Sequence, residues 1–135
     1  MADFIGENEQ KNRKIRSLPR KLSDCVSKLR AEVLVPADDM DMEIRVACGA
    51  DLMSDVMAFA CTTNEMMLTG LVNLQTIRTA EMMDVKAIVF VRGKVPIPGM
   101  IELATEKKIC IMTTPLPMFT ACGLLYESGV KGKGE

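Results

Sequence analysis

A chain of 135 residues, of which 48% are apolar, is long enough for one domain with a hydrophobic core and too apolar to be largely disordered. It has no His, which removes the commonest general base, and its five Cys contain no Cys-x-x-Cys pair of the kind that holds zinc or iron–sulfur clusters. No run approaches the roughly 18 apolar residues of a membrane-spanning helix, and residues 1–7 lack a signal pattern. We therefore expect a cytoplasmic protein without a resident metal or cofactor.

The formal net charge of −1 is unevenly distributed. Residues 1–30 hold eight Lys or Arg against four Asp or Glu, whereas residues 31–55 hold seven acidic residues and one Arg. A basic head can contact nucleic acid or a membrane surface. It lacks the aromatic residues that single-strand binders interleave with basic ones, so we expect a solvated, flexible leader at 1–16 that contacts neither.

From residue 17 onward, helical and strand-like patterns alternate. Ser17, Leu18 and Pro19 mark a helix start, and apolar residues continue at helical spacing to Leu29. The strand-like segments that follow are 31–35, 43–48, 65–69, 86–91 and 109–112. The helical segments after them are 51–60, 74–83, 97–107 and 115–128. Residues 131–135 are expected to form a mobile tail.

Local signals support these boundaries. Asn73 can cap the helix that follows it, Thr114 before Pro115 predicts the start of the last helix, and Gly129 predicts its end. Short links between strands and helices predict βαβ units. We expect a single three-layer α/β/α domain at 17–130 with a mainly parallel sheet.

The turn after the predicted strand 43–48 is the most informative segment. Gly49 lets a ligand approach the backbone, and Asp51, Ser54 and Asp55 follow in the first turn of a predicted helix. Their side chains can simply cap that helix. Alternatively they form part of a polar site, in which the helix N-terminus attracts phosphate and the two carboxylates repel it unless a cation such as Mg²⁺ bridges them.

Polar residues also follow the other predicted strands. Asn73 is more a cap than a ligand group. Arg92, followed by Gly93, can bind a carboxylate or phosphate with its guanidinium, or pair with a local acid. Thr113 and Thr114 can cap the last helix or face a shared cleft. Because the carboxyl ends of parallel strands meet at one edge, these residues converge with Gly49 and Asp51, which favours a small-molecule site.

Sulfur-containing residues are frequent in the predicted core. Four of the five Cys lie in or beside apolar runs, which favours buried thiols; the five are Cys25, Cys48, Cys61, Cys110 and Cys122. Most of the twelve Met also suit the core. The adjacent pairs at 66–67 and 82–83 cannot both point inward on a simple amphipathic element, which favours a second apolar surface buried in a homodimer.

Three segments together resemble the DRTGG domain, which is similar in turn to the N-terminal domain of HPr kinase/phosphorylase. They are 49–58, 87–93 and 114–126, and the resemblance covers about 31–130. Its most specific part is the run from Asp51 to Val56; the Asp-Arg-Thr-Gly-Gly string itself does not occur in this chain. The resemblance implies an α/β/α domain that self-associates. DRTGG domains accompany nucleotide-sensing CBS domains in regulated pyrophosphatases, and genes for stand-alone members often lie near hydrogenase and sensor-kinase components.

The sequence thus favours a non-catalytic regulatory domain that dimerises and binds a small anionic ligand, such as a nucleotide. Catalysis would require acid–base work by Asp51, Asp55 or a metal, and the Gly-x-x-x-x-Gly-Lys-Ser/Thr phosphate loop of a kinase is absent from the sequence. The alternative is an interaction or assembly module for a redox complex of the hydrogenase type or for a signalling complex, in which the polar residues only cap helices.

Overall fold

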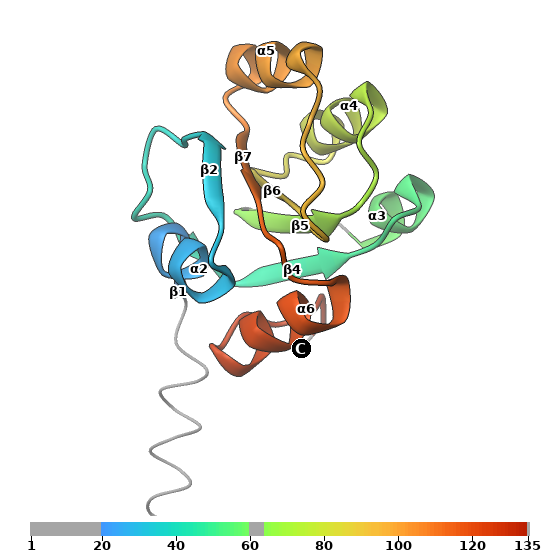
Figure 1. Ribbon diagram of the computed structural model, residues 1–135. Coiled ribbons are helices and arrows are strands. Elements are labelled where there is room, and N and C mark those ends of the chain that lie inside the picture. The colour runs from blue at the N-terminus through green and yellow to red at the C-terminus, as the bar shows by residue number, and fades with distance from the viewer. Residues whose placement is uncertain (1–19, 60–63, 135) are drawn as a thin grey trace, which may run out of the picture.

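A five-stranded sheet forms the middle of the molecule in the computed structural model, which describes residues 20–59 and 64–134 (Figure 1). Its strands, in spatial order, are β2 (Glu32–Val35), β7 (Cys110–Thr113), β6 (Ala87–Phe90), β5 (Glu65–Thr69) and β4 (Val46–Gly49). The last four are parallel, and β2 is antiparallel to β7. A separate antiparallel ribbon joins β1 (Arg20–Lys21) to β3 (Glu43–Ile44).

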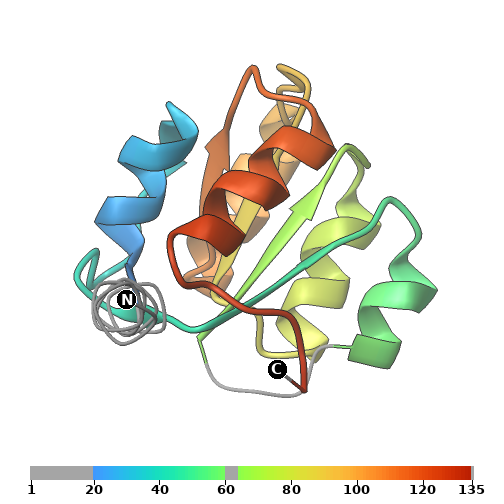
Figure 2. The same ribbon diagram turned by 90° about the horizontal axis from the view of Figure 1, so that it is seen from below.

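Helices cover both faces of the sheet (Figures 1 and 2). One face carries α2 (Leu22–Leu29) and α6 (Met118–Glu127), and the other carries α3 (Met53–Phe59), α4 (Leu74–Met82) and α5 (Pro98–Lys107). The predicted three-layer α/β/α fold with a mainly parallel sheet is therefore confirmed. None of these helices is long and apolar enough to cross a membrane.

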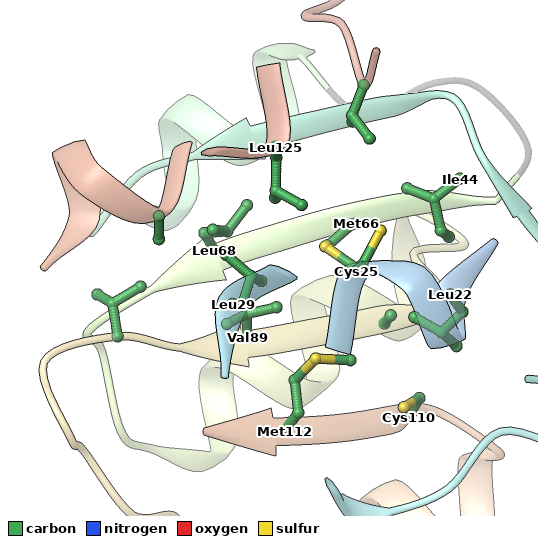
Figure 3. Close-up of a cluster of buried hydrophobic side chains, with 14 residues drawn as sticks. Leu22, Cys25, Leu29, Ile44, Met66, Leu68, Val89, Cys110, Met112 and Leu125 are labelled. Carbon is green, nitrogen blue, oxygen red and sulfur yellow. The ribbon is translucent and has the colours of Figure 1, made fainter. Parts of the chain in front are cut away.

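Burial on both faces explains the unbroken apolar strands. In β6, Ala87 and Val89 belong to the core under α2 and α6, whereas Ile88 and Phe90 belong to the core on the opposite face. Parallel strands covered on both sides have no polar face, so consecutive apolar residues are stable there. Figure 3 shows Val89 in the first of these cores.

The same geometry corrects the interpretation of the methionine pair at 66–67. Met66 and Met67 are both completely buried, on opposite faces of β5. This pair therefore requires no partner chain. In the other pair, Met82 is exposed and Met83 is half-buried.

Several element boundaries differ from those predicted. The segment 43–48 is divided at Arg45 into β3 and β4, which belong to different sheets. The first helix begins at Leu22, while the predicted leader at 1–16 and the helix start at 17–19 lie outside the described residues. Helix α3 begins at Met53 and buries Met53 and Val56, leaving Leu52 exposed.

The segment after α6 continues along the sheet. Helix α6 ends near Gly129, as predicted, and Lys131 then forms a parallel bridge with Val46 of β4. The Lys131 N–H donates to the carbonyl of Arg45, and the Ala47 N–H donates to the carbonyl of Lys131, both at 2.9 Å. Hydrogen bonding to the sheet thus includes the first residue of the predicted tail.

Thr114 holds two distant parts of the chain together. Its side chain is completely buried; the hydroxyl donates to the carbonyl of Leu29 at 2.6 Å and accepts from the N–H of Leu116 at 3.2 Å. It therefore satisfies the last carbonyl of α2 and does not cap the last helix, which begins three residues later than predicted, after Pro117. The cap expected from Thr114 and Pro115 is wrong because the hydroxyl donates to Leu29 at the end of α2, which is 85 residues away in the sequence.

We predict that Thr114→Val destabilises the domain by about 1–3 kcal/mol, because it leaves a buried carbonyl without its donor. Urea unfolding followed by circular dichroism measures the change as a shift of the midpoint. Thr105→Val is the matched control: the Thr105 hydroxyl also donates to a backbone carbonyl, of Ile101 at 2.8 Å, but it is exposed to water. Equal losses in the two variants would contradict the role given to Thr114.

Candidate functional site

The turn that follows β4 is held close to α6. A Cβ atom added to Gly49 would lie 2.8 Å from the Cys122 sulfur and 3.0 Å from the Met118 sulfur. Only a residue without a side chain therefore fits between β4 and the first turns of α6 without displacing them. This contact brings the start of α6 to the same edge of the sheet as the β4–α3 turn.

Asp51 joins three of the loops at this edge. Its Oδ1 accepts a hydrogen bond from the backbone N–H of Gly70 at 2.7 Å and one from the Thr69 hydroxyl at 3.5 Å. Its Oδ2 forms an ion pair with Nη2 of Arg92 at 3.4 Å. Asp51 lies before α3, and its carboxylate bonds along the edge of the sheet to the loops after β5 and β6. The capping interpretation of Asp51 is therefore wrong.

Arg92 has an unusual backbone that its neighbours stabilise. Its φ of 58° is in the left-handed region, as is that of Gly93 at 68°. The N–H groups of Arg92 and Gly93 donate to the carbonyls of Leu116 and Thr114, both at 2.8 Å. The loop after β7 thereby fixes the direction in which the Arg92 side chain leaves the sheet.

The guanidinium of Arg92 lies over Gly70. A Cβ atom added to Gly70 would be 1.9 Å from Nη2 of Arg92, so the absence of a side chain at Gly70 makes room for the cation. The Arg92 side chain is 42% exposed and that of Asp51 is 54% exposed. The pair is therefore accessible to a ligand from solvent.

Electrostatics keep Asp51 ionised. The hydrogen bond from the Gly70 N–H lowers the pKa of this carboxyl group below its ordinary value, and the nearby charge of Arg92 lowers it further against the opposing effect of burial. Arg92 in turn compensates the negative charge that would repel an anion from this edge. The arrangement suits a ligand that approaches the free side of the guanidinium.

The structure brings some of the remaining candidate residues to this edge and assigns others to structural contacts. Ser54 and Asp55 lie exposed on α3. Asn73 caps α4, as predicted, by accepting from the N–H of Thr76 at 3.2 Å. The Thr113 hydroxyl donates to the carbonyl of Lys94 at 2.6 Å, which ties it to the loop that carries Arg92. Thr114, by contrast, donates its hydroxyl to the carbonyl of Leu29 at the end of α2.

The cysteines in the described part of the chain lie in environments that disfavour the thiolate. Cys25 and Cys110 are buried, and Cys48 and Cys122 are half-buried. Burial raises the thiol pKa to about 12 for Cys25 and about 11 for Cys48 and Cys110, and it raises that of Cys122. Cys25 and Cys110 agree with the expected buried thiols, Cys48 and Cys122 are only partly buried, and Cys61 lies outside the described residues. The described residues contain no group of three or more His, Cys, Asp or Glu side chains that could hold a metal ion.

Sequence patterns gave no functional role to a set of exposed apolar residues at this edge. Phe119, in the first turn of α6, is 89% exposed, and the others are Leu52, Leu74, Val95 and Ile97. Each lies in the loop or first helical turn that follows a strand. The only sequence signal is an apolar residue placed beside a turn and outside the buried face of a helix.

Two hollows in the described part of the structure border α6. One, of about 370 Å³, lies between α2 and α6 and is lined by residues that include Arg20, Cys25 and Ser128. The other, of about 200 Å³, lies between β4 and α6 and is lined by residues that include Gly49 and Tyr126. Neither of these two is lined by Asp51 or Arg92, whose side chains are 54% and 42% exposed.

Comparison with solved structures identifies the fold. No protein-family model and no curated protein matches the chain. The structure is similar, with a TM-score of 0.63 and 21% sequence identity, to the CBS and DRTGG domains of the regulatory region of Clostridium perfringens pyrophosphatase, solved with the activator diadenosine tetraphosphate. The match covers 85% of this chain and 48% of the other, so this chain spans about half of that structure. The expected DRTGG-like fold is thus supported, and the similarity to HPr kinase/phosphorylase stays a prediction.

We predict that Asp51→Asn lowers stability at neutral pH by about 0.5–1.5 kcal/mol. A hydrogen bond to a charged group contributes more than this, but solvent screens the half-exposed carboxylate. The pKa of Asp51 is lower in the folded than in the unfolded state. Its contribution is therefore complete above about pH 4 and is lost as pH falls through the folded-state pKa.

Urea unfolding of both proteins at several pH values between 7 and 3 measures this effect. The difference in unfolding free energy between wild type and Asp51→Asn should shrink toward the acidic end. Asp55→Asn, at an exposed carboxylate four residues further on, is the control and should change stability little at any of these pH values. A difference for Asp51→Asn that stays constant from pH 7 to 3 would show that the charge of Asp51 contributes nothing.

Proposed function

We propose that this protein is a non-catalytic regulatory domain that dimerises and binds a small anionic ligand at the carboxyl ends of its parallel strands, with Arg92 as the main contact. The observation that carries the proposal is the Arg92 guanidinium, held over Gly70 and oriented by Asp51 at a solvent-accessible edge. Ligands of open α/β sheets bind outside these strand ends.

The chemistry of Arg92 favours phosphate or carboxylate. Its ion pair with Asp51 engages Nη2, and a guanidinium has five N–H donors in a planar fork that matches these anions. Lys94, two residues further on, is also exposed and adds positive charge. Gly49, Gly93 and Thr113 complete the proposed site by shaping its backbone.

A nucleotide is the ligand class that we consider first. The regulatory region with the similar fold was solved with diadenosine tetraphosphate as its activator, which supports testing adenine nucleotides on this chain. Phe119 offers an exposed aromatic ring at the same edge, on which a base can stack. Phosphate groups on Arg92 and a base on Phe119 would use both features.

The environments of the ionisable groups argue against catalysis at this site. The pKa of Asp51 is lowered, which makes its carboxylate a weak base at neutral pH, and the described thiols have raised pKa values. We infer that the ligand acts by binding one arrangement of the dimer more tightly than another, which shifts the population between them.

The alternative function, an interaction or assembly module, is favoured by one observation. Phe119 and Leu52 expose large apolar side chains at this edge, and contiguous apolar surface marks protein contacts. In that case the edge binds a larger partner, and Asp51 and Arg92 only stabilise the loops. Cytoplasmic location, and a redox or signalling partner, stay predictions under both functions.

The proposal is tested by a dye-based thermal shift against adenine nucleotides, diadenosine tetraphosphate and pyrophosphate, each with and without Mg²⁺. Dye is needed because the chain has no Trp. A ligand at 100 times its Kd should add about 2.7 kcal/mol of stability, which for a domain of this size raises Tm by on the order of 10 °C.

Two variants connect a shift to the site. Arg92→Ala should abolish it, and Gly70→Ala should weaken it because the new methyl group displaces the guanidinium without changing any charge. Arg45→Ala, which removes an exposed Arg at β3–β4, should leave the shift intact. No shift with any ligand, or an undiminished shift in Arg92→Ala, would overturn the assignment and favour the interaction module.

A further inference from the structure

The exposed apolar side chains of this domain gather at one edge of the sheet. Among the described residues, eight large apolar side chains are exposed, and five of them follow the carboxyl ends of strands. These five, which we call the strand-end apolar set, are Leu52, Leu74, Val95, Ile97 and Phe119. The other three, Met57, Met82 and Tyr126, lie on three different helices away from the strand ends.

Parallel pairing explains this concentration. The strands β4, β5, β6 and β7 run in the same direction, so the loops after them meet at one edge; Figure 1 shows β4 and β5 aligned in this way. The close approach of Gly49 to Met118 places the start of α6, and with it Phe119, at the same edge. A monomer gains nothing from keeping Phe119 89% exposed, and apolar residues gathered on one surface indicate a surface that another molecule covers.

The charges at this edge indicate which molecule that is. The segments at the carboxyl ends of the four parallel strands, 49–55, 70–74, 91–98 and 113–119, contain two acidic and two basic residues: Asp51, Asp55, Arg92 and Lys94. Such a balanced surface does not select a strongly charged partner. It is complementary to itself, because a two-fold axis brings each residue of the surface opposite the same surface of the second copy.

The ion pair at this edge suits exchange between two copies. Asp51 and Arg92 are both about half exposed, and their contact of 3.4 Å is a single hydrogen bond from Nη2. Oδ1 of Asp51 accepts from Thr69 and Gly70, whereas the other N–H groups of the Arg92 guanidinium have no hydrogen-bond partner among the described residues. In a dimer, Arg92 of one copy can add a contact to Asp51 of the other without breaking the bond from Gly70.

We propose that two copies of this chain associate through the strand-end edge, with the strand-end apolar sets packed together and with Asp51 and Arg92 paired between copies. The proposed dimer rests on the proposed function in one respect. The edge that would bind the ligand is also the face through which the two copies meet, so that a bound anion lies between them. A ligand held there by Arg92 of both copies would change how the copies meet.

Reversing the charges tests this pairing directly. Asp51→Arg places like charges opposite each other in its homodimer, and so does Arg92→Asp; Asp tolerates the left-handed backbone at position 92. In an equimolar mixture, both inter-copy pairs again join opposite charges. We expect sedimentation equilibrium of the full chain to show a dimer for wild type, a dissociation constant raised about tenfold or more for each variant alone, and a dimer for the mixture.

The matched control uses an exposed ion pair elsewhere. Glu43 and Arg45 lie 3.3 Å apart and are exposed on β3 and just after it. Glu43→Arg and Arg45→Glu should each dimerise as wild type does. A loss of association in these variants equal to that in the strand-end variants would show a nonspecific charge effect and would overturn the proposal.

A second pair of variants does not depend on the charges. Phe119→Ser should weaken the dimer strongly, whereas Tyr126→Ser, at the other end of the same helix and 49% exposed, should not. This pair decides the matter if the charge reversals fail to fold, as checked by circular dichroism. A monomeric wild type, or a Phe119→Ser variant that dimerises normally, would overturn the proposal. A monomer that still shows an Arg92-dependent ligand shift would overturn the dimer and leave only the ligand-binding part of the proposed function standing.

Discussion

The backbone N–H of Gly70 donates to the carboxylate of Asp51, and the arrangement of the strand-end loops depends on this bond. It fixes the turn after β4 against the turn after β5, and the carboxylate then positions the guanidinium of Arg92. Because Gly70 has no side chain, the same residue supplies the donor and leaves the space that the guanidinium fills. One short contact thereby combines three loops into a single charged surface.

The sheet confines chemistry to this surface. Its central strands are buried on both faces, so polar side chains there require partners inside the domain. Thr114, just after β7, illustrates this requirement, since its buried hydroxyl donates to the carbonyl of Leu29 at the end of α2. Only where the strands end can Asp51 and Arg92 reach solvent and keep their charges. A regulatory site and an interface are thus alternatives for the same surface, or features that coexist on it.

Local patterns predicted the parts of the fold that local interactions determine. The strand at 86–91 and the cap at Asn73 follow from neighbouring residues, and both occur in the structure. The capping alternatives for Asp51 and Thr114 considered only their neighbours in the sequence. Their actual partners, Gly70 and Leu29, are 19 and 85 residues away. The exposure of the Phe119 side chain was missed for a related reason, since it depends on where the start of α6 meets the sheet.

The two edge strands of the sheet, β2 and β4, are protected in different ways against pairing with strands of other molecules. An open edge strand is a template on which further strands add without limit. On β4, Lys131 occupies part of the outer side through a parallel bridge, and on β2 the register shifts between Val33 and Val35, just before Pro36. A bridge at one edge, and an irregularity followed by proline at the other, both discourage growth of a continuous sheet. Both features therefore disfavour edge-to-edge aggregation of copies of this chain. They leave association into a closed assembly as the favoured alternative.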